Sequence, residues 1–121
     1  MYCERHTIAL TTNGSGAATG YTPVVSGRVL SVVYTKTDFA DTADITITAD
    51  VTGMAILTLT DQTASGTFHP RAQVHGPTGT ALTLNGTQTV NEPVPVAAER
   101  VKVVLEQGGV TKSGCVTIVL G

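Results

Sequence analysis

The chain of 121 residues is long enough for one domain with a buried core, and its 41% hydrophobic content indicates a globular protein. The formal net charge is −2, and the seven basic residues are scattered along the chain, so no basic patch for nucleic acid is expected. No apolar stretch reaches the roughly 20 residues that a membrane-spanning helix needs, so a membrane is not an expected partner either.

Threonine and valine dominate the composition, with 22 and 16 residues. Both side chains branch at Cβ and fit the pleated surface of a β-sheet. Aromatic residues make up only 4% of the chain, so Val, Ile, Leu and Ala must fill the core. Because aromatic side chains otherwise supply much buried area, burial against a partner would help such a domain, and we expect it to assemble.

The first half of the chain predicts a series of short strands. Residues 5–12 lead to the pair Asn13-Gly14, a strong hairpin signal, so we expect residues 17–21 to return antiparallel to them. Residues 27–36 form a run too apolar to face water on either side, which predicts a central strand.

A second hairpin is predicted at residues 44–60. In residues 44–51, Ile45, Ile47, Ala49 and Val51 alternate with polar residues and are expected to share one face. A turn at Thr52-Gly53 then leads into a strand over residues 54–60.

The second half of the chain continues this pattern. Residues 67–75 predict a strand. Because Pro70 has no N–H to donate, this strand is expected at a sheet edge or with a bulge. Residues 76–92 are small and polar and predict the longest excursion, with a short strand at 82–84. Residues 97–106 favour a strand over a helix because they are rich in β-branched side chains, and residues 112–120 close the fold.

About eight short strands with frequent turns predict an all-β protein. We expect a single domain over residues 1–121, built as an antiparallel β-sandwich or a jelly-roll-like barrel. Residues 1–6 are expected to form a flexible or partner-contacting N-terminal arm. These six residues have no apolar segment of the kind found in a signal peptide, so Cys3 and Cys115 are expected to be free thiols in a reducing compartment.

The three histidines, His6, His69 and His75, are the candidates for a zinc site. Period 2 places His69 and His75 on the same face of one strand. Six residues at about 3.3 Å each separate them by roughly 20 Å, which is too far for one ion. We therefore expect these side chains to be solvated or hydrogen-bonded in loops.

An acidic loop holds Asp38, Asp41 and Asp44, which are candidates for calcium. Their spacing of every third residue lacks the alternate-residue pattern of a calcium loop, and Asp is favoured in turns because it caps its own backbone. We predict no metal and no cofactor.

Catalytic patterns are weak throughout the chain. No Ser occupies a nucleophile elbow, and the glycines at 27 and 53 do not lead into a helix that could bind phosphate. Paired carboxylates for glycoside cleavage stay open, but a sugar-processing cleft needs stacking aromatics, which are scarce here. We expect that the protein is not an enzyme.

Five segments together resemble small β-rich proteins encoded in the head-gene region of tailed bacteriophages and prophages. They are GYTP (20–23), GRVL (27–30), YTKTDFAD (34–41), HPRAQVH (69–75) and AERVKVVLEQGG (98–109). The resemblance covers most of residues 5–120, and none of its motifs carries chemistry.

The resemblance implies a structural virion protein, most plausibly a capsid decoration or cement protein on the outside of the capsid. Its implied partners are the major capsid protein and other copies of itself, in a homotrimer made in the host bacterial cytoplasm. The N-terminal arm, which can order on a neighbouring surface, and the edge segment broken by Pro70 are the expected contacts. These residues are Met1, Tyr2, Cys3, Glu4, Arg5, His6, Phe68, His69, Pro70 and Arg71.

Two alternative functions stay open. A neck, collar or fibre-attachment protein of the virion would have the same composition. A carbohydrate- or receptor-binding β-sandwich would need surface aromatics for stacking, and Tyr21 and Tyr34 are the candidates.

Overall fold

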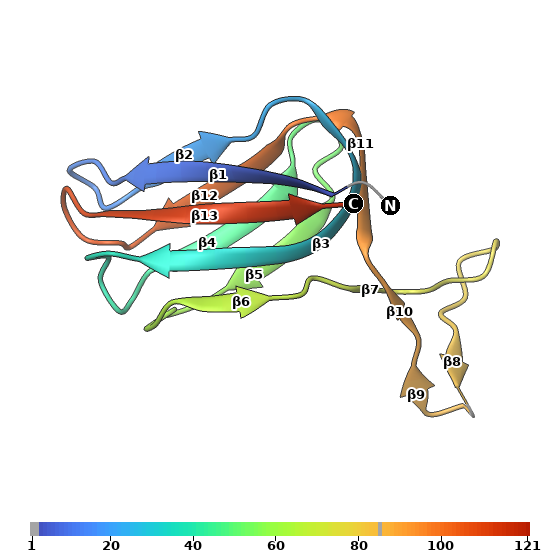
Figure 1. Cartoon of the computed structure of the whole chain (residues 1–121). Coiled ribbons are helices and arrows are strands. Elements are labelled where there is room, and N and C mark those ends of the chain that lie inside the picture. The colour runs from blue at the N-terminus through green and yellow to red at the C-terminus, as the bar shows by residue number, and fades with distance from the viewer. Residues whose placement is uncertain (1–2, 85) are drawn as a thin grey trace.

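The computed structural model describes residues 3–84 and 86–121, and these residues form antiparallel β-sheets (Figure 1). The predicted all-β class is confirmed. No helix in the described ranges is long and apolar enough to cross a membrane. The strands are β1 (Glu4–Thr11), β2 (Ala18–Tyr21), β3 (Val25–Lys36), β4 (Asp44–Ala49), β5 (Ala55–Leu59), β6 (Gly66–Phe68), β7 (Ala72–Gln73), β8 (Thr83–Leu84), β9 (Gln88–Thr89), β10 (Asn91–Glu92), β11 (Val94–Glu99), β12 (Val101–Glu106) and β13 (Ser113–Leu120).

Two sheets form the layers of a sandwich. The first has the order β1-β13-β3-β11. β11 pairs with the first part of β3, and β6 pairs with a later part of the same edge. The second has the order β2-β12-β4-β5. The predicted central position of residues 27–36 is confirmed, because β3 pairs with β13 on one side and with β11 and β6 on the other.

One hydrophobic core lies between the two sheets. Its fully buried side chains come from alternate positions of β3, β4, β12 and β13, as the period of two requires. The largest are Tyr34, Ile45, Ile47, Leu105, Ile118, Leu120, Val29, Val32, Val101, Val103 and Val116. Ile45, Ile47 and Ala49 share the buried face as predicted, and the hairpin of β4 with β5 is confirmed. The expectation for Val51 is wrong: β4 ends at Ala49, and Val51 is 80% exposed in the following turn.

The predicted pairing of residues 5–12 with residues 17–21 is wrong. β1 pairs with β13 in one sheet, and β2 pairs with β12 in the other. The side-chain oxygen of Asn13 accepts hydrogen bonds from the backbone N–H groups of Ser15 and Ala17, which gives a wider loop than a two-residue hairpin turn. The loop therefore carries the chain from one layer of the sandwich to the other.

The strand predicted over residues 97–106 is two strands in different sheets. β11 pairs with β3, β12 pairs with β2 and β4, and Arg100 lies between them. The register of β11 shifts between Val96 and Glu99, and Ala98 has a positive φ of 52°. This local distortion turns the chain across the edge of the sandwich.

The strand predicted over residues 67–75 is also broken. β6 ends at Phe68, and after Pro70 the chain leaves the sandwich. The described residues 72–84 and 86–92 form a separate extension, which Figure 1 shows projecting from the body. In it β7 pairs with β10 and β8 pairs with β9, so the predicted short strand at 82–84 is present as β8.

Candidate interaction surfaces

Half of the predicted N-terminal arm belongs to a strand. Glu4, Arg5 and His6 belong to β1 and pair with residues of β13. The expectation of a flexible arm is therefore wrong for these three residues, because their backbone completes an edge of the sheet. Cys3 precedes the strand and is exposed, whereas Met1 and Tyr2 lie outside the described residues.

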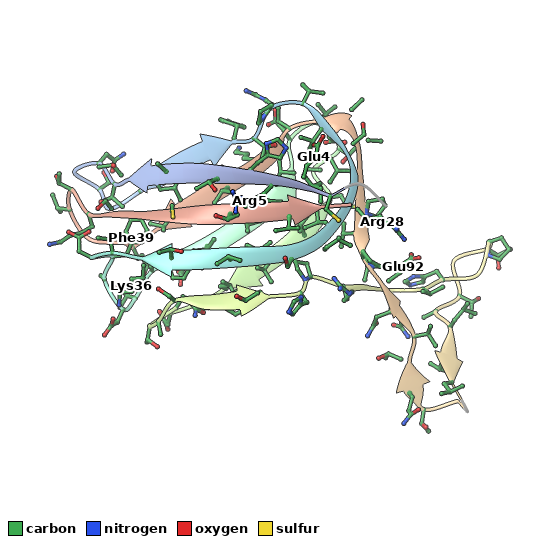
Figure 2. The ribbon with its side chains drawn as sticks, in the orientation of Figure 1. Glu4, Arg5, Arg28, Lys36, Phe39 and Glu92 are labelled. Atoms are coloured by element: carbon green, nitrogen blue, oxygen red, sulfur yellow. The ribbon has the colours of Figure 1, made fainter. Side chains whose placement is uncertain are left out.

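A shallow hollow of about 630 Å³ adjoins this strand end and is lined by Cys3, Glu4, Arg5, His6 and Val119. His6 Nε2 lies 3.3 Å from a carboxylate oxygen of Glu4. Figure 2 shows Glu4 and Arg5 on β1, near the end of the sandwich where β13 also finishes. Contact of these residues with another protein stays a prediction.

The segment Phe68–Arg71 anchors the extension to the sandwich. Phe68 is half-buried and packs against the core, and Pro70 is buried. The Arg71 guanidinium donates hydrogen bonds to the carbonyl oxygens of Leu30 and Pro70, at 3.0 and 2.7 Å. His69 and Arg71 are exposed, so the predicted contacts of this segment are sterically open at these two residues.

The histidines do not form a cluster. His69 follows β6, and His75 lies in the extension, where its Nδ1 is 2.7 Å from the carbonyl oxygen of Gln73. The expectation that His69 and His75 share one strand is wrong, because the chain turns away from the sandwich between them.

The acidic loop uses its carboxylates separately. Asp38 accepts a hydrogen bond from the N–H of Ser113, and Asp44 accepts one from the N–H of Asp61. Asp41 forms an ion pair with Lys36. Within residues 3–84 and 86–121, no three His, Cys, Asp or Glu side chains are grouped so that they could hold a metal ion.

The outer face of the first sheet is almost free of charge, and we call it the neutral face. Its side chains lie opposite the buried positions of β1, β13, β3 and β6, in rows set by the register of the strands. They are Arg5, Thr7, Ala9, Thr11, Ser113, Cys115, Thr117, Val119, Arg28, Ser31, Val33, Thr35 and Thr67, with the two charged residues, Arg5 and Arg28, at the same end of the sheet. The hydroxyl oxygens of Thr7 and Thr117 lie 3.1 Å apart, which ties the first two strands together at the centre of this face.

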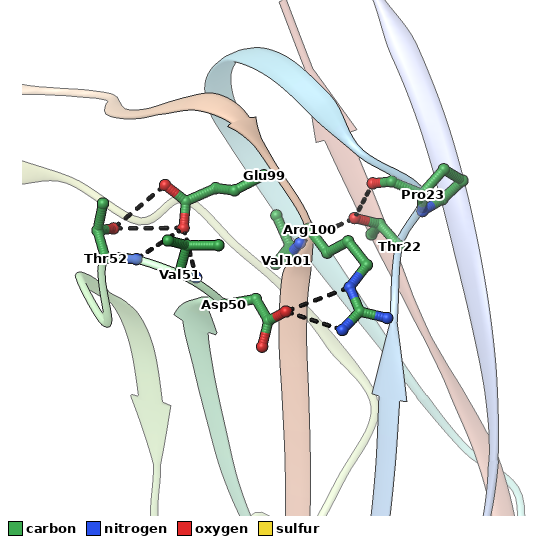
Figure 3. Close-up of polar contacts among 8 residues, drawn as sticks. All are labelled: Thr22, Pro23, Asp50, Val51, Thr52, Glu99, Arg100 and Val101. Atoms are coloured by element: carbon green, nitrogen blue, oxygen red, sulfur yellow. Dashed lines mark hydrogen bonds and ion pairs between the residues drawn. The ribbon is translucent and has the colours of Figure 1, made fainter.

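The chain crossing between β11 and β12 holds a buried carboxylate. Glu99 is only 5% exposed, and its Oε1 accepts hydrogen bonds from the N–H groups of Val51 at 2.8 Å and Thr52 at 3.0 Å (Figure 3). The hydroxyl of Thr52 lies 3.3 Å from both oxygens of the same carboxylate. Hydrogen bonds to the charged form, above all from the backbone of Thr52, lower the pKa of Glu99 from its ordinary value of 4.5.

Arg100 connects this network to Asp50, which follows β4, and to Tyr21 in β2. Its guanidinium donates hydrogen bonds to Asp50 Oδ2 at 2.9 and 3.2 Å, as Figure 3 shows, and its Cζ lies 4.1 Å from the ring centroid of Tyr21. We call Asp50, Val51, Thr52, Glu99 and Arg100 the Glu99 cluster. It fixes the β4–β5 turn to the β11–β12 crossing.

Four large apolar side chains are exposed around the Glu99 cluster, and we call them the loop-end patch. They are Tyr21, Val24, Val51 and Met54, from the β2–β3 loop and the β4–β5 turn. Val25 pairs with Glu99, and the Thr22 hydroxyl accepts a hydrogen bond from the N–H of Val101, so both loops are attached to the same crossing. The sequence did not reveal this patch, since its members come from separate segments.

Comparison of the chain with protein-family models, with curated proteins and with solved structures gave no match.

Proposed function

We propose that the protein is a structural component of the virion of a tailed bacteriophage. In this role it decorates and stabilises the outer capsid shell and binds the major capsid protein as a homotrimer. The proposal combines the sequence resemblance described above with one observation on the fold, the neutral face of the first sheet.

The neutral face has the composition of an interface centre. Charged side chains are depleted at the centres of protein interfaces, because their burial requires desolvation that must be offset by pairing. This face has Thr, Ser, Val, Ala and Cys side chains around the Thr7–Thr117 pair, with Arg5 and Arg28 at one end. Its small side chains allow another sheet or a flat protein surface to approach closely.

Binding alone is enough for the proposed role. A protein that binds assembled capsid subunits stabilises them by mass action, in proportion to its affinity and concentration. A homotrimer presents three copies of such a face and suits a threefold position on a shell, because closed oligomers and shells share cyclic symmetry.

The direct test is the composition of purified particles of the parent phage. If the protein decorates the capsid, quantitative mass spectrometry should find copies in proportion to the major capsid protein, including in tailless heads. A copy number in proportion to the tail proteins would indicate a neck, collar or fibre-attachment protein instead. Absence from the particle would contradict a structural role.

A charge placed at the centre of the neutral face tests which surface makes the contact. We expect Thr117→Lys to weaken capsid binding at least about tenfold, or about 1.4 kcal/mol. Thr46→Lys, on the exposed outer face of the second sheet, is the matched control and should bind like the wild type. Equal binding by both variants, with thermal unfolding unchanged, would show that another surface contacts the capsid.

A further inference from the structure

The extension makes its own hydrogen bonds and leaves most of its side chains exposed. In the described part of the extension, backbone bonds run from Val74 N to Val90 O and from Leu82 N to Val74 O, both at 2.7 Å. The Gln73 side chain adds a bond to the carbonyl oxygen of Leu82. At its root, Arg71 donates a hydrogen bond to the carbonyl oxygen of Leu30 in β3, and Pro70 is buried. Figure 1 shows the extension leaving the sandwich after β6.

Such a ribbon is poorly stabilised on its own. Two-stranded β-structure is at best marginally stable in water unless a further strand or an apolar surface covers one side. The extension exposes Leu82, Leu84 and Val90, with Leu84 55% exposed. A surface that covers these side chains would supply the missing burial.

The loop-end patch has the complementary properties. It is apolar at Val24, Val51 and Met54, and the Glu99 cluster holds its loops in place before any partner binds. Preorganised loops lose little conformational entropy on binding. Of the exposed large apolar side chains in the described ranges, all except Val110 lie on the patch or on the extension.

The charges of the two surfaces are also compatible. The ionisable residues of the extension are His75 and Glu92, and Figure 2 shows Glu92 at the root of the extension. On the patch, Arg100 and Asp50 pair with each other. Contact between the two surfaces would therefore not bury an unpaired charge, whereas a basic or acidic partner would find no complementary charge on either.

We propose that the extension of one copy of this chain docks on the loop-end patch of a second copy. The contact joins two different surfaces, so it is heterologous and repeats from copy to copy until a ring closes. The inference extends the proposed homotrimer by assigning its contact, and it can be tested on the isolated protein without any capsid.

Sedimentation velocity over a concentration series tests this contact. The wild-type chain should form a closed oligomer of the 12.4 kDa chain. The double variants Leu82→Thr/Leu84→Thr, on the extension, and Val24→Thr/Val51→Thr, on the patch, should both sediment as monomers. Threonine keeps the β-branched shape of valine and favours strand structure at the two leucine positions. Val110→Thr, at an exposed valine outside both surfaces, should leave the oligomer unchanged.

Mixing the two double variants gives a second, sharper readout. The extension variant keeps an intact patch and the patch variant keeps an intact extension, so one contact can form and a 1:1 heterodimer should appear. A monomeric wild type would overturn the proposal, as would a patch variant that assembles normally. Loss of assembly by both variants without a heterodimer would also overturn it. If the extension variant kept its oligomer but no longer bound the capsid, the extension would contact the capsid and not a second copy.

Discussion

Tyr34 is a buried aromatic residue whose hydroxyl has no hydrogen-bond partner among the described residues. Its ring is nearly parallel to that of Phe39, with the centroids 6.2 Å apart, so the ring contributes packing. A buried polar group without a partner costs free energy, and we expect Tyr34→Phe to raise the free energy of unfolding by about 1 kcal/mol. Urea denaturation of both proteins at neutral pH measures this change. A clear decrease would mean that the hydroxyl makes a stabilising contact.

The same residue predicts a loss of stability at alkaline pH. Burial raises the pKa of Tyr34 above its ordinary value of 10.0. Above pH 10 the unfolded chain therefore releases this proton more readily than the folded chain, and stability falls as pH rises towards the folded pKa. Tyr34→Phe should reduce this loss of stability. Urea denaturation of both proteins, from neutral pH to above pH 10, measures the free energy of unfolding at each pH. Parallel pH profiles would contradict it.

Glu99 is the opposite case, a buried carboxylate whose hydrogen bonds favour its charged form. Because its folded pKa is lowered, its contribution is present above about pH 4.5 and is lost as pH falls through the folded pKa. Glu99→Gln keeps an oxygen for the N–H groups of Val51 and Thr52 but removes the negative charge that strengthens these hydrogen bonds. We expect it to lower the melting temperature at neutral pH and to flatten the acid side of the stability profile.

Glu106→Gln is the control for this change, since Glu106 is exposed at the end of β12. Its melting temperature should stay close to that of the wild type. If Glu99→Gln behaves like Glu106→Gln at every pH, the Glu99 cluster does not hold the β4–β5 turn.

At the scale of elements, β1 and β2 approach each other through a glycine. A Cβ on Gly20 would lie 2.4 Å from Ile8 Cγ2 and 3.0 Å from Leu10 Cδ2, so the two strands could not keep their positions. We expect Gly20→Ala to destabilise the protein by about 1–3 kcal/mol, measured by thermal unfolding. Gly14→Ala, where a Cβ meets no atom within 4 Å, should change the stability little. An equal effect at both glycines would refute this account of the contact.

The sequence predicted strands better than their partners. The alternation of Ile45 and Ile47 identifies β4 because side-chain period follows directly from strand geometry. It does not show that a strand changes sheets. The valines shift from even positions at Val94 and Val96 to odd positions at Val101 and Val103, and a bulge within one strand would give the same shift. Glu99 was the available signal, because a carboxylate at a position that alternates with valines must find hydrogen bonds when it is buried.

At the scale of the whole molecule, the candidate surfaces were predictable only in part. The small polar residues 76–92 indicated an excursion, and the structure shows an extension there. The loop-end patch combines Tyr21 and Val24 with Val51 and Met54, which only the packing of the two sheets brings to one end. Single-sequence patterns report neighbours along the chain, so a patch made by separate loops escapes them.

Hydrogen exchange should separate the extension from the sandwich. In monomers the amides of Val74 and Leu82 should exchange far faster than those of Val32 and Ile118, because a two-stranded ribbon opens without disturbing the core. When the chain self-associates through the extension, protection at Val74 and Leu82 should rise with protein concentration while the core amides stay unchanged. Exchange by mass spectrometry at low and high concentration measures both sites at once. Protection of the extension already equal to that of the core in monomers would show that the ribbon is stable alone and needs no second copy.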